Sequence, residues 1–413
     1  MRRHVGIIGG GAAGLFTACQ IKRLDAASDI DVTILEKMDT PGIKLTLTGH
    51  GRCNITNLKD AAALKKGYHE AENFIYPALR EFGPSDTISF FEDELGLPLK
   101  EEDNNRIFPV CDSAVKVRDK IVSYISDCCD IKTGVKVLGI SGENDFEVKT
   151  SSGTYHFDMI VLSCGGSSFK RTGSTGDSYV LAESLAHTTV PVRGALAPVN
   201  AGRDSLGFCR MLSGVSVDAG VSLYAEGRKA AFVRGDILFA DFGLTGPAIM
   251  EIARQIPSDP ESKDVYLELD LIPSMSDEEF GKVLLKLIGE HADTKMTTLL
   301  GRFMPDSLAD SVALKAGVSD LYAQGFTKEN RKKLISSSKH LKIRLDRSPD
   351  LDKAYVTRGG VSLKEVDRKT MQSKLVPGLY ILGEALDVDG VSGGYNLQAC
   401  MSEAYLAAKS ILN

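Results

Sequence analysis

A glycine-rich turn between an apolar strand and an apolar helix constrains this chain more than any other feature. The strand is expected over residues 4–8, and the glycines after it have the spacing Gly9-x-Gly11-x-x-Gly14. Gly9 permits the tight turn, Gly11 lets a pyrophosphate approach the backbone, and Gly14 lets the helix pack closely on the strand. The free N–H groups at the start of the helix attract phosphate. The turn therefore predicts an α/β fold of the doubly wound Rossmann type with a dinucleotide site.

The second strand of this unit is expected over residues 30–35 and ends in an acid. Glu36 follows Gly14 by 22 residues, so its carboxylate is placed to accept hydrogen bonds from a ribose diol. A carboxylate there also repels a 2′-phosphate, which favours an adenosine without one. A glycine-rich turn with no nucleotide role explains this whole order of strand, turn, helix, strand and acid less well.

Three later segments favour FAD over NAD. An apolar strand over residues 158–162 ends in Cys164-Gly165-Gly166, a pattern that resembles flavoproteins with two dinucleotide folds. The strand at residues 379–382 leads into Gly383-Glu384, whose carboxylate suits the ribityl chain of FAD. The last helix follows Gly393 and Gly394, so its first N–H groups suit the flavin pyrimidine. Each segment alone also fits a buried strand or a capped helix, but their order predicts a non-covalently bound FAD.

Composition narrows the classes of function. The 413 residues include 49 Lys and Arg against 55 Asp and Glu, a net charge of −6, and the chain has no apolar run of the ~18 residues that a membrane helix needs. We therefore expect no nucleic-acid partner and no membrane. The eight cysteines have neither a Cys-x-x-Cys pair nor metal-type spacing, which predicts reduced thiols and no metal site. With no visible signal peptide, the sequence predicts a cytoplasmic protein.

The order of patterns along the chain indicates an insertion into the nucleotide-binding domain. Residues 70–130 are expected to be largely helical, and a period of two predicts a β-meander over residues 136–157. Strands around one helix near residues 246–255 are expected in the middle of the chain. Ser276 and Glu279 form a capping-box pattern that opens a helical stretch to about residue 340. The closing helix is expected over residues 397–412.

A series of short motifs runs along most of the chain. They are Gly9–Gly14, Gly51–Asn57, Arg106–Pro109, Gly165–Ser167, Gly173–Asp177, Gly243–Ala248, Thr357–Val361, Gly383–Gly390 and Gly394–Gln398. Together these motifs resemble those of the bacterial NAD(P)/FAD-dependent oxidoreductases called the YhiN-like family, to which the bile-acid-pathway flavoprotein BaiN also belongs. His50 departs from the family pattern, which usually has glycine there, and Arg358 and Cys400 are smaller departures.

The resemblance implies a discontinuous FAD-binding domain, an inserted β-rich domain similar to a barrel, and a small helical domain. We place the FAD-binding domain at residues 1–193 and 356–413. The β-rich domain is expected at residues 194–274 and 341–355, and the helical domain at residues 275–340.

Few side chains are expected to act chemically, because a flavin carries out the electron transfer itself. His50 and Tyr395 are the candidate proton donors, although a lone loop histidine is more often structural. Lys44 and Arg52 are candidates to neutralise pyrophosphate or reduced flavin, and Cys53 is either a reactive thiol or a packed one. The residues expected to bind the cofactor are Gly9, Gly11, Ala12, Ala13, Gly14, Glu36, Lys37, Lys44, Gly51, Arg52, Cys53, Asn54, Val135, Cys164, Gly165, Gly166, Gly383, Glu384, Asp387, Gly394, Tyr395, Asn396 and Leu397.

These features predict an FAD-dependent oxidoreductase that acts on a small organic molecule. The chain has no second Gly-x-Gly-x-x-Gly, so NAD(P)H is expected to bind transiently as the electron donor. In the favoured interpretation, hydride reduces an activated carbon–carbon double bond. An oxidase of amines or alcohols, a folate-dependent or tRNA-modifying flavoprotein, and a non-catalytic redox sensor are the alternatives. The oligomeric state is left open.

Overall fold

The computed structural model describes residues 2–25 and 29–413 and divides into two compact units. The first unit comprises Met1–Arg193 and Val356–Asn413, and the second comprises Gly194–Tyr355. Each unit has its own hydrophobic core. The first unit is therefore built from both ends of the chain, and the second is inserted between them.

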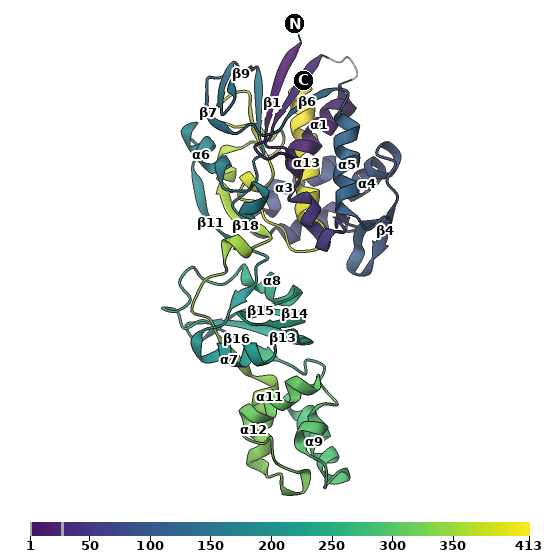
Figure 1. Cartoon of the computed structure of the whole chain (residues 1–413), viewed down its shortest axis with the longest axis vertical. Coiled ribbons are helices and arrows are strands. Elements are labelled where there is room, and N and C mark those ends of the chain that lie inside the picture. The colour runs from purple at the N-terminus through teal and green to yellow at the C-terminus, as the bar shows by residue number, and fades with distance from the viewer. Residues whose placement is uncertain (1, 26–28) are drawn as a thin grey trace. The chain divides into compact units, whose positions relative to one another are not determined.

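A five-stranded parallel sheet forms the centre of the first unit (Figure 1). Its strands, in spatial order, are β19 (Leu379–Ile381), β10 (Met159–Leu162), β1 (Arg3–Ile8), β2 (Ile30–Leu35) and β6 (Cys129–Lys132). The strands other than β6 are rich in apolar residues, as expected for a sheet that is covered on both faces, whereas the edge strand β6 also contains Asp130 and Lys132. The arrangement confirms the expected α/β fold with a Rossmann-type sheet.

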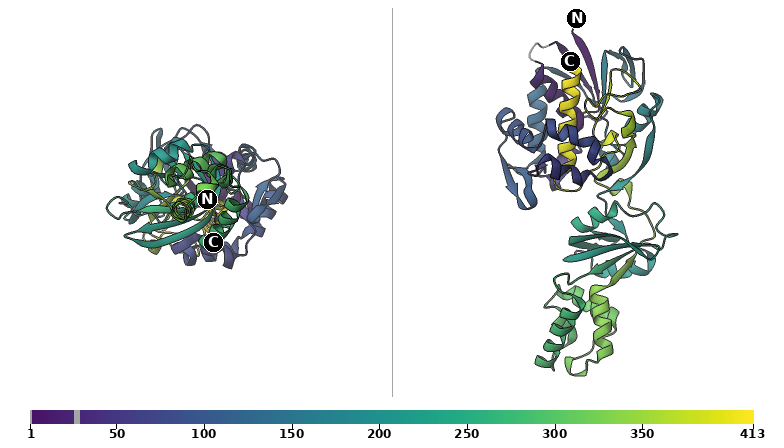
Figure 2. Two further views of the ribbon diagram at one scale, coloured as in Figure 1. Left: turned by 90° about the horizontal axis from the view of Figure 1, so that it is seen from below. Right: turned by 180° about the vertical axis from the view of Figure 1, so that it is seen from behind.

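Helices from distant parts of the sequence pack together beside this sheet. The closing helix α13 (Tyr395–Leu412) is mostly buried and packs against α1 (Ala12–Leu24) and α3 (Glu72–Glu81), and α1 also contacts α5 (Ala114–Ile125). Figure 2 shows α13, in yellow, among the helices of the first unit from behind. Three further short helices are α2 (Ala61–Leu64), α4 (Pro84–Ser89) and α6 (Asp177–Ser184).

Smaller sheets complete the first unit. The predicted meander is formed by β7 (Val137–Ser141), β8 (Phe146–Thr150) and β9 (Gly153–Phe157). A two-stranded sheet joins β11 (Thr189–Ala195) to β18 (Val356–Val361). The third sheet contains β3 (Thr56–Asn57), β5 (Arg106–Pro109) and β4 (Leu99–Glu102).

That third sheet corrects the expectation that residues 70–130 are largely helical. Strands β4 and β5 form an antiparallel hairpin inside this stretch. Asn104 and Asn105 turn the chain with φ of 63° and 60°, a left-handed conformation that asparagine tolerates better than most residues. The turn chemistry of two adjacent asparagines therefore outweighed the helical pattern around it.

The second unit combines a six-stranded antiparallel sheet with helices. The strands, in spatial order, are β12 (Val199–Asn200), β15 (Gly243–Thr245), β14 (Arg228–Ala240), β13 (Ser216–Ala225), β16 (Tyr266–Asp270) and β17 (Leu341–Arg344). The helices are α7 (Arg203–Met211), α8 (Pro247–Ala253), α9 (Asp277–Glu290), α10 (Met296–Leu300), α11 (Asp306–Ala316) and α12 (Lys328–Lys339).

The helices of this unit include the predicted capping box at Ser276 and one helix, α7, that was not predicted. The Ser276 hydroxyl accepts a hydrogen bond from the Glu279 N–H at 3.2 Å, and the Glu279 carboxylate accepts one from the Ser276 N–H at 2.8 Å, which is the expected capping box. The single helix expected among the strands is joined by a second, α7. Gly207 within α7 weakens the helical pattern in the sequence.

Candidate functional site

The glycine turn lies where β1 gives way to α1, at the carboxyl end of the parallel sheet. Gly9 has a φ of 102°, and a Cβ on Gly14 would lie 2.1 Å from the carbonyl oxygen of Gly9. Among the described residues, a Cβ on Gly11 would meet only the Ser163 carbonyl oxygen, at 4.0 Å, so these residues leave space open above Gly11. Ala12 and Ala13 begin α1, whose start has no side-chain cap among the described residues. The turn therefore offers free N–H groups next to open space.

Glu36 lies at the end of β2 and is fixed by the backbone on both sides. Its carboxylate accepts hydrogen bonds from the N–H groups of Gly10 and Met38, both at 2.8 Å. Burial raises the pKa of Glu36, and these two bonds partly oppose that rise. The N–H of Val135 donates to the Glu36 carbonyl at 2.9 Å, so Val135 supports the backbone here. The acid is held beside the glycine turn, as a ribose-binding carboxylate requires.

Lys37 links the end of β2 to the start of α6. Its ammonium donates to the Thr175 hydroxyl at 2.5 Å and to the Asp177 carboxylate at 2.7 Å. Burial alone would raise the pKa of Asp177, but the hydrogen bond and charge of Lys37, together with the Thr175 hydroxyl, lower it overall. The Gly173–Asp177 turn is therefore tied to the end of β2.

A second glycine turn follows β10, the strand next to β1. The Ser163 hydroxyl donates to the carbonyls of Ile8 and Gly9, both at 3.1 Å, which joins the two turns. Burial raises the pKa of the Cys164 thiol to about 12, so this thiol stays protonated. The Ser174 hydroxyl is buried without a partner among the described residues, and it would lie 3.2 Å from a Cβ on Gly165. An unpaired buried hydroxyl beside a glycine turn fits a polar group of a bound ligand.

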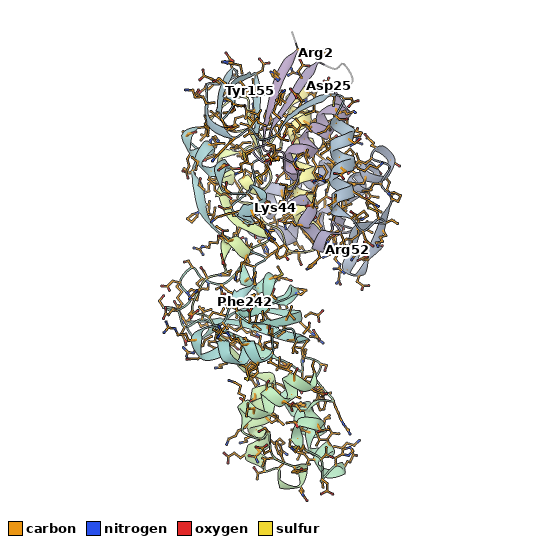
Figure 3. All side chains as sticks on the ribbon, in the orientation of Figure 1. Arg2, Asp25, Lys44, Arg52, Tyr155 and Phe242 are labelled. Atoms are coloured by element: carbon orange, nitrogen blue, oxygen red, sulfur yellow. The ribbon has the colours of Figure 1, made fainter. Side chains whose placement is uncertain are left out.

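The strongest polar cluster of the first unit surrounds Glu384, in the turn after β19. The Lys44 ammonium donates to both Glu384 carboxylate oxygens, at 2.9 and 2.8 Å, and to the Ser168 hydroxyl at 2.8 Å. The N–H of Thr357 donates to the same carboxylate at 3.3 Å. Figure 3 labels Lys44 within the first unit. Four distant segments therefore meet at Glu384. The sequence singled out Lys44 as a candidate to neutralise pyrophosphate or reduced flavin, and did not predict its ion pair with Glu384.

The start of α13 is held close to β3. A Cβ on Gly394 would lie 2.5 Å from the carbonyl carbon of Thr56, so no other residue fits there. With its amide oriented to satisfy its hydrogen bonds, Asn54 accepts from the Gly394 N–H at 3.2 Å. Asn396 exchanges two hydrogen bonds with the backbone of Gly390, at 2.8 and 3.0 Å. Leu397 lies buried in the first turn of the helix.

Tyr395 is buried at the start of α13, and its hydroxyl lies beside a lysine. The Lys59 ammonium is 3.0 Å from the Tyr395 hydroxyl, and the Tyr68 hydroxyl donates to the Tyr395 carbonyl at 2.7 Å. Nothing in the sequence pattern pointed to Lys59, which lies 336 positions earlier in the chain. The pair forms only through the fold.

The long loop between β2 and β3 contains three more residues that the sequence analysis singled out, His50, Gly51 and Cys53. His50 and Cys53 have φ of 57° and 68°, and Gly51 lies between them with φ of 83°. His50 is exposed, whereas Cys53 is completely buried and burial raises its pKa to about 12. The packed-thiol interpretation of Cys53 therefore agrees with the structure better than the reactive one.

Arg52 is engaged by the β4–β5 hairpin. Its guanidinium contacts the Glu102 carboxylate, donates to Asp112 at 2.7 Å, and lies 4.4 Å from the centre of the Phe108 ring. Figure 3 labels it at the margin of the first unit. These contacts support the loop, and the role of Arg52 toward a cofactor stays a prediction. Asp387 similarly accepts from the Gly359 N–H at 2.9 Å.

The described residues contain no group of three His, Cys, Asp or Glu side chains placed to hold a metal ion. In the same part of the chain, no helix is long and apolar enough to cross a membrane.

Comparison with known proteins places this site in a family. The model of the HI0933-like protein Rossmann domain matches residues 3–410. The chain is 31% identical to a 3-dehydro-bile acid delta(4,6)-reductase of Clostridium scindens, over 98% of each chain. It is also 31% identical to a ribosomal RNA dihydrouridine synthase of Haemophilus influenzae, over 98% of this chain and 97% of that protein.

Among solved structures, the chain is similar to a 3-ketosteroid delta1-dehydrogenase from Sterolibacterium denitrificans. The TM-score is 0.49 and the identity 13%, with 98% of each chain covered.

Proposed function

The chain belongs to the HI0933-like family of flavin-dependent oxidoreductases, and from that premise we propose that it is an FAD-dependent reductase. We propose that it takes electrons from NAD(P)H and reduces a carbon–carbon double bond conjugated to a carbonyl group. The observation that carries the proposal is the meeting of three predicted cofactor segments. The turns after β1, β10 and β19 lie on adjacent parallel strands, at the edge where α/β sheets bind nucleotides.

The residues present fit FAD. The open space above Gly11 and the unpaired Ser174 hydroxyl offer room and a polar partner for a phosphate-bearing ligand. Glu36 would hold the adenosine ribose, and the first N–H groups of α1 would face the pyrophosphate. Glu384 and Lys44 would hold the ribityl region, and the start of α13 would face the pyrimidine ring. When bound, FAD supplies the hydride of the reaction.

The protein must supply a proton to the second carbon of the double bond. Tyr395 is the better of the two predicted donors, because the residue is buried and its hydroxyl is paired with Lys59. The ammonium donates to the phenolic oxygen, which leaves the phenolic proton for another partner. His50, exposed on its loop, is the second candidate.

The relatives' names define one class of bond. A 3-dehydro-bile acid with delta(4,6) unsaturation has double bonds conjugated to a ketone, and the uracil ring has a double bond conjugated to its carbonyl at C4. Reduction of either requires hydride on one carbon and a proton on the next. We therefore propose the conjugated double bond as the shared target.

The expectation of no nucleic-acid partner rested on the net charge of −6. A relative that is named as a ribosomal RNA dihydrouridine synthase argues against using the net charge to exclude an RNA substrate. Net charge averages over the whole surface and does not exclude a local site for RNA.

Turnover with two substrates tests the proposal. Purified protein is incubated anaerobically with NADH or NADPH and either a steroid 4-en-3-one or single-stranded RNA that contains uridine, and mass spectrometry detects a gain of two hydrogens. Tyr395→Phe should lower the rate by about 10²–10⁴-fold while the flavin content stays unchanged. Leu375→Ala, an exposed position of the same unit, is the matched control. Turnover that consumes only oxygen and an amine or alcohol would contradict the proposal.

A further inference from the structure

The antiparallel sheet of the second unit has one buried face and one open face. Val221 and Leu223 on β13 point into the core with Ile237 and Phe239 on β14. Residues of opposite parity point the other way, and the register pairs Ser222 with Phe232. We define the outer sheet face by Tyr224, Phe232, Tyr266, Lys229 and Lys342.

Three aromatic rings lie on this outer sheet face, of which Phe232 is exposed and Tyr224 and Tyr266 are half-buried. Phe232 is 58% exposed, although it belongs to the middle of a long strand. A Cβ on Gly220 would lie 3.3 Å from Cε2 of Phe232, so the ring lies against this glycine while more than half of the side chain stays exposed. Tyr224 and Tyr266 are paired across β13 and β16, and their rings stack 5.0 Å apart at an angle of 6°.

Unpaired ammonium groups lie next to these rings. Lys229 Nζ is 4.7 Å from the centre of the Phe232 ring, and Lys342 Nζ is 4.6 Å from the centre of the Tyr266 ring. Within residues 2–25 and 29–413, neither lysine has a carboxylate at ion-pair distance. The two amines therefore keep their charge available on the outer sheet face.

Three carboxylates on the same face are paired within the unit, whereas Asp236, which lies opposite Asp218, is exposed and has no ion pair among the described residues. Asp270 accepts from Lys339 at 2.8 Å, and Glu268 lies 3.3 Å from His340 Nδ1. Asp218 pairs with Arg234 at 2.9 Å. The exposed Phe232 ring and the two ammonium groups thus form a surface on which Asp218, Glu268 and Asp270 have basic partners and Asp236 has none.

We propose that the outer sheet face binds single-stranded RNA. Open aromatic rings stack with nucleobases, and neighbouring lysines attract the phosphates between them. A sheet with exposed aromatic residues is a recurrent platform for this purpose. The inference rests on the proposed function and deepens it, because it selects RNA over a free small molecule as the carrier of the conjugated double bond.

Fluorescence anisotropy of a short fluorescein-labelled single-stranded RNA of mixed sequence tests this surface on the full-length, FAD-loaded protein. Phe232→Leu keeps an apolar side chain over Gly220 but removes the ring. It should weaken binding by about 5- to 100-fold, as expected for the loss of one stacked base. Tyr266→Leu should act in the same way and provides a second variant if Phe232→Leu folds poorly. Lys342→Met should reduce the slope of log affinity against log salt by about 0.7.

Leu314→Ala is the matched control, because Leu314 is also 59% exposed and apolar but lies on α11 of the same unit. It should bind RNA like the unchanged protein. The inference is overturned if the protein does not bind the RNA, or if both ring variants bind it with unchanged affinity.

Reduction of the flavin by NAD(P)H is followed in the same preparations. If reduction persists and RNA binding is absent, this inference fails and the proposed function stands. If no nicotinamide nucleotide reduces the flavin, the proposed function fails whatever the RNA result.

Discussion

Glu403 is a buried acid whose protonation makes the stability of the protein depend on pH. The residue lies on α13, completely buried, and one carboxylate oxygen accepts from the N–H of Gly383 at 2.6 Å. The other oxygen has no partner among the described residues. Burial raises the pKa of Glu403 from 4.5 to about 8, and the bond from Gly383 only partly opposes this. The carboxyl group is therefore neutral in the folded protein at neutral pH.

The sign of the pH effect follows from proton binding. Between pH 4.5 and 8 the folded protein holds a proton on Glu403 that the unfolded chain has lost, so the free energy of unfolding falls as pH rises. At about 1.4 kcal/mol for each pH unit, the loss is about 3 kcal/mol at pH 7. Glu403→Gln keeps a neutral group and an acceptor for the Gly383 N–H. The variant should therefore be more stable by about 3 kcal/mol at pH 7 and by little near pH 4.5.

Urea unfolding from pH 5 to pH 9 measures this difference. Glu81→Gln is the control, because Glu81 is a half-exposed acid of the same unit that pairs with Lys409 at 2.8 Å. It should change the free energy of unfolding by less than about 1 kcal/mol. A Glu403→Gln protein that is less stable at pH 7, or that keeps the pH dependence of the unchanged protein, would refute the reasoning.

Three further predictions concern the glycine turn, the thiols and the second unit. Gly14→Ala should purify without flavin absorbance, because its Cβ would lie 2.1 Å from the Gly9 carbonyl oxygen. A disulfide reagent should modify exposed Cys111 quickly and buried Cys53 only after unfolding, so Cys111→Ser should remove part of the fast phase. Lys339→Met should destabilise the second unit by about 3 kcal/mol in urea unfolding, since a buried ammonium that holds a carboxylate and two carbonyls is lost.

Matched variants control these experiments. Gly289→Ala should keep the flavin, because nothing lies within 4 Å of its Cβ. Cys53→Ser should leave the fast phase of modification intact. Lys332→Met, at an exposed position of α12, should change stability by less than about 0.5 kcal/mol. The reasoning is contradicted by flavin retained in Gly14→Ala, by rapid modification of Cys53 in the folded protein, or by an unchanged unfolding curve for Lys339→Met.

The sequence predicted best those features of the fold that depend on residues close together in the chain. The glycine turn, the acid at the end of β2 and the Ser276 capping box each depend on residues within one or two elements. The parallel sheet followed from short apolar strands and confirmed the α/β fold. The hairpin at residues 99–109 was missed because two asparagines set its turn inside a largely helical stretch.

The polar contacts of the site could not be predicted from the sequence, because they join residues from distant segments. Ser168 reaches Glu384 across 216 positions, and Thr357 reaches it across 27. Lys59 meets Tyr395 across 336 positions. Such pairs depend on which strands and loops become neighbours, and no periodicity in a single sequence encodes that. Ser168 and Thr357 lie in or beside motifs that matched the family, but nothing in those motifs assigned them to Glu384.

The absorption spectrum of the purified protein, recorded anaerobically while NADH and then NADPH is added, tests whether the protein binds FAD and takes electrons from NAD(P)H. The chain contains no tryptophan, so flavin emission can be followed in parallel without tryptophan fluorescence. We expect a yellow protein whose flavin absorbance is bleached by one of the two nucleotides. A colourless protein that does not take up added FAD would contradict this expectation.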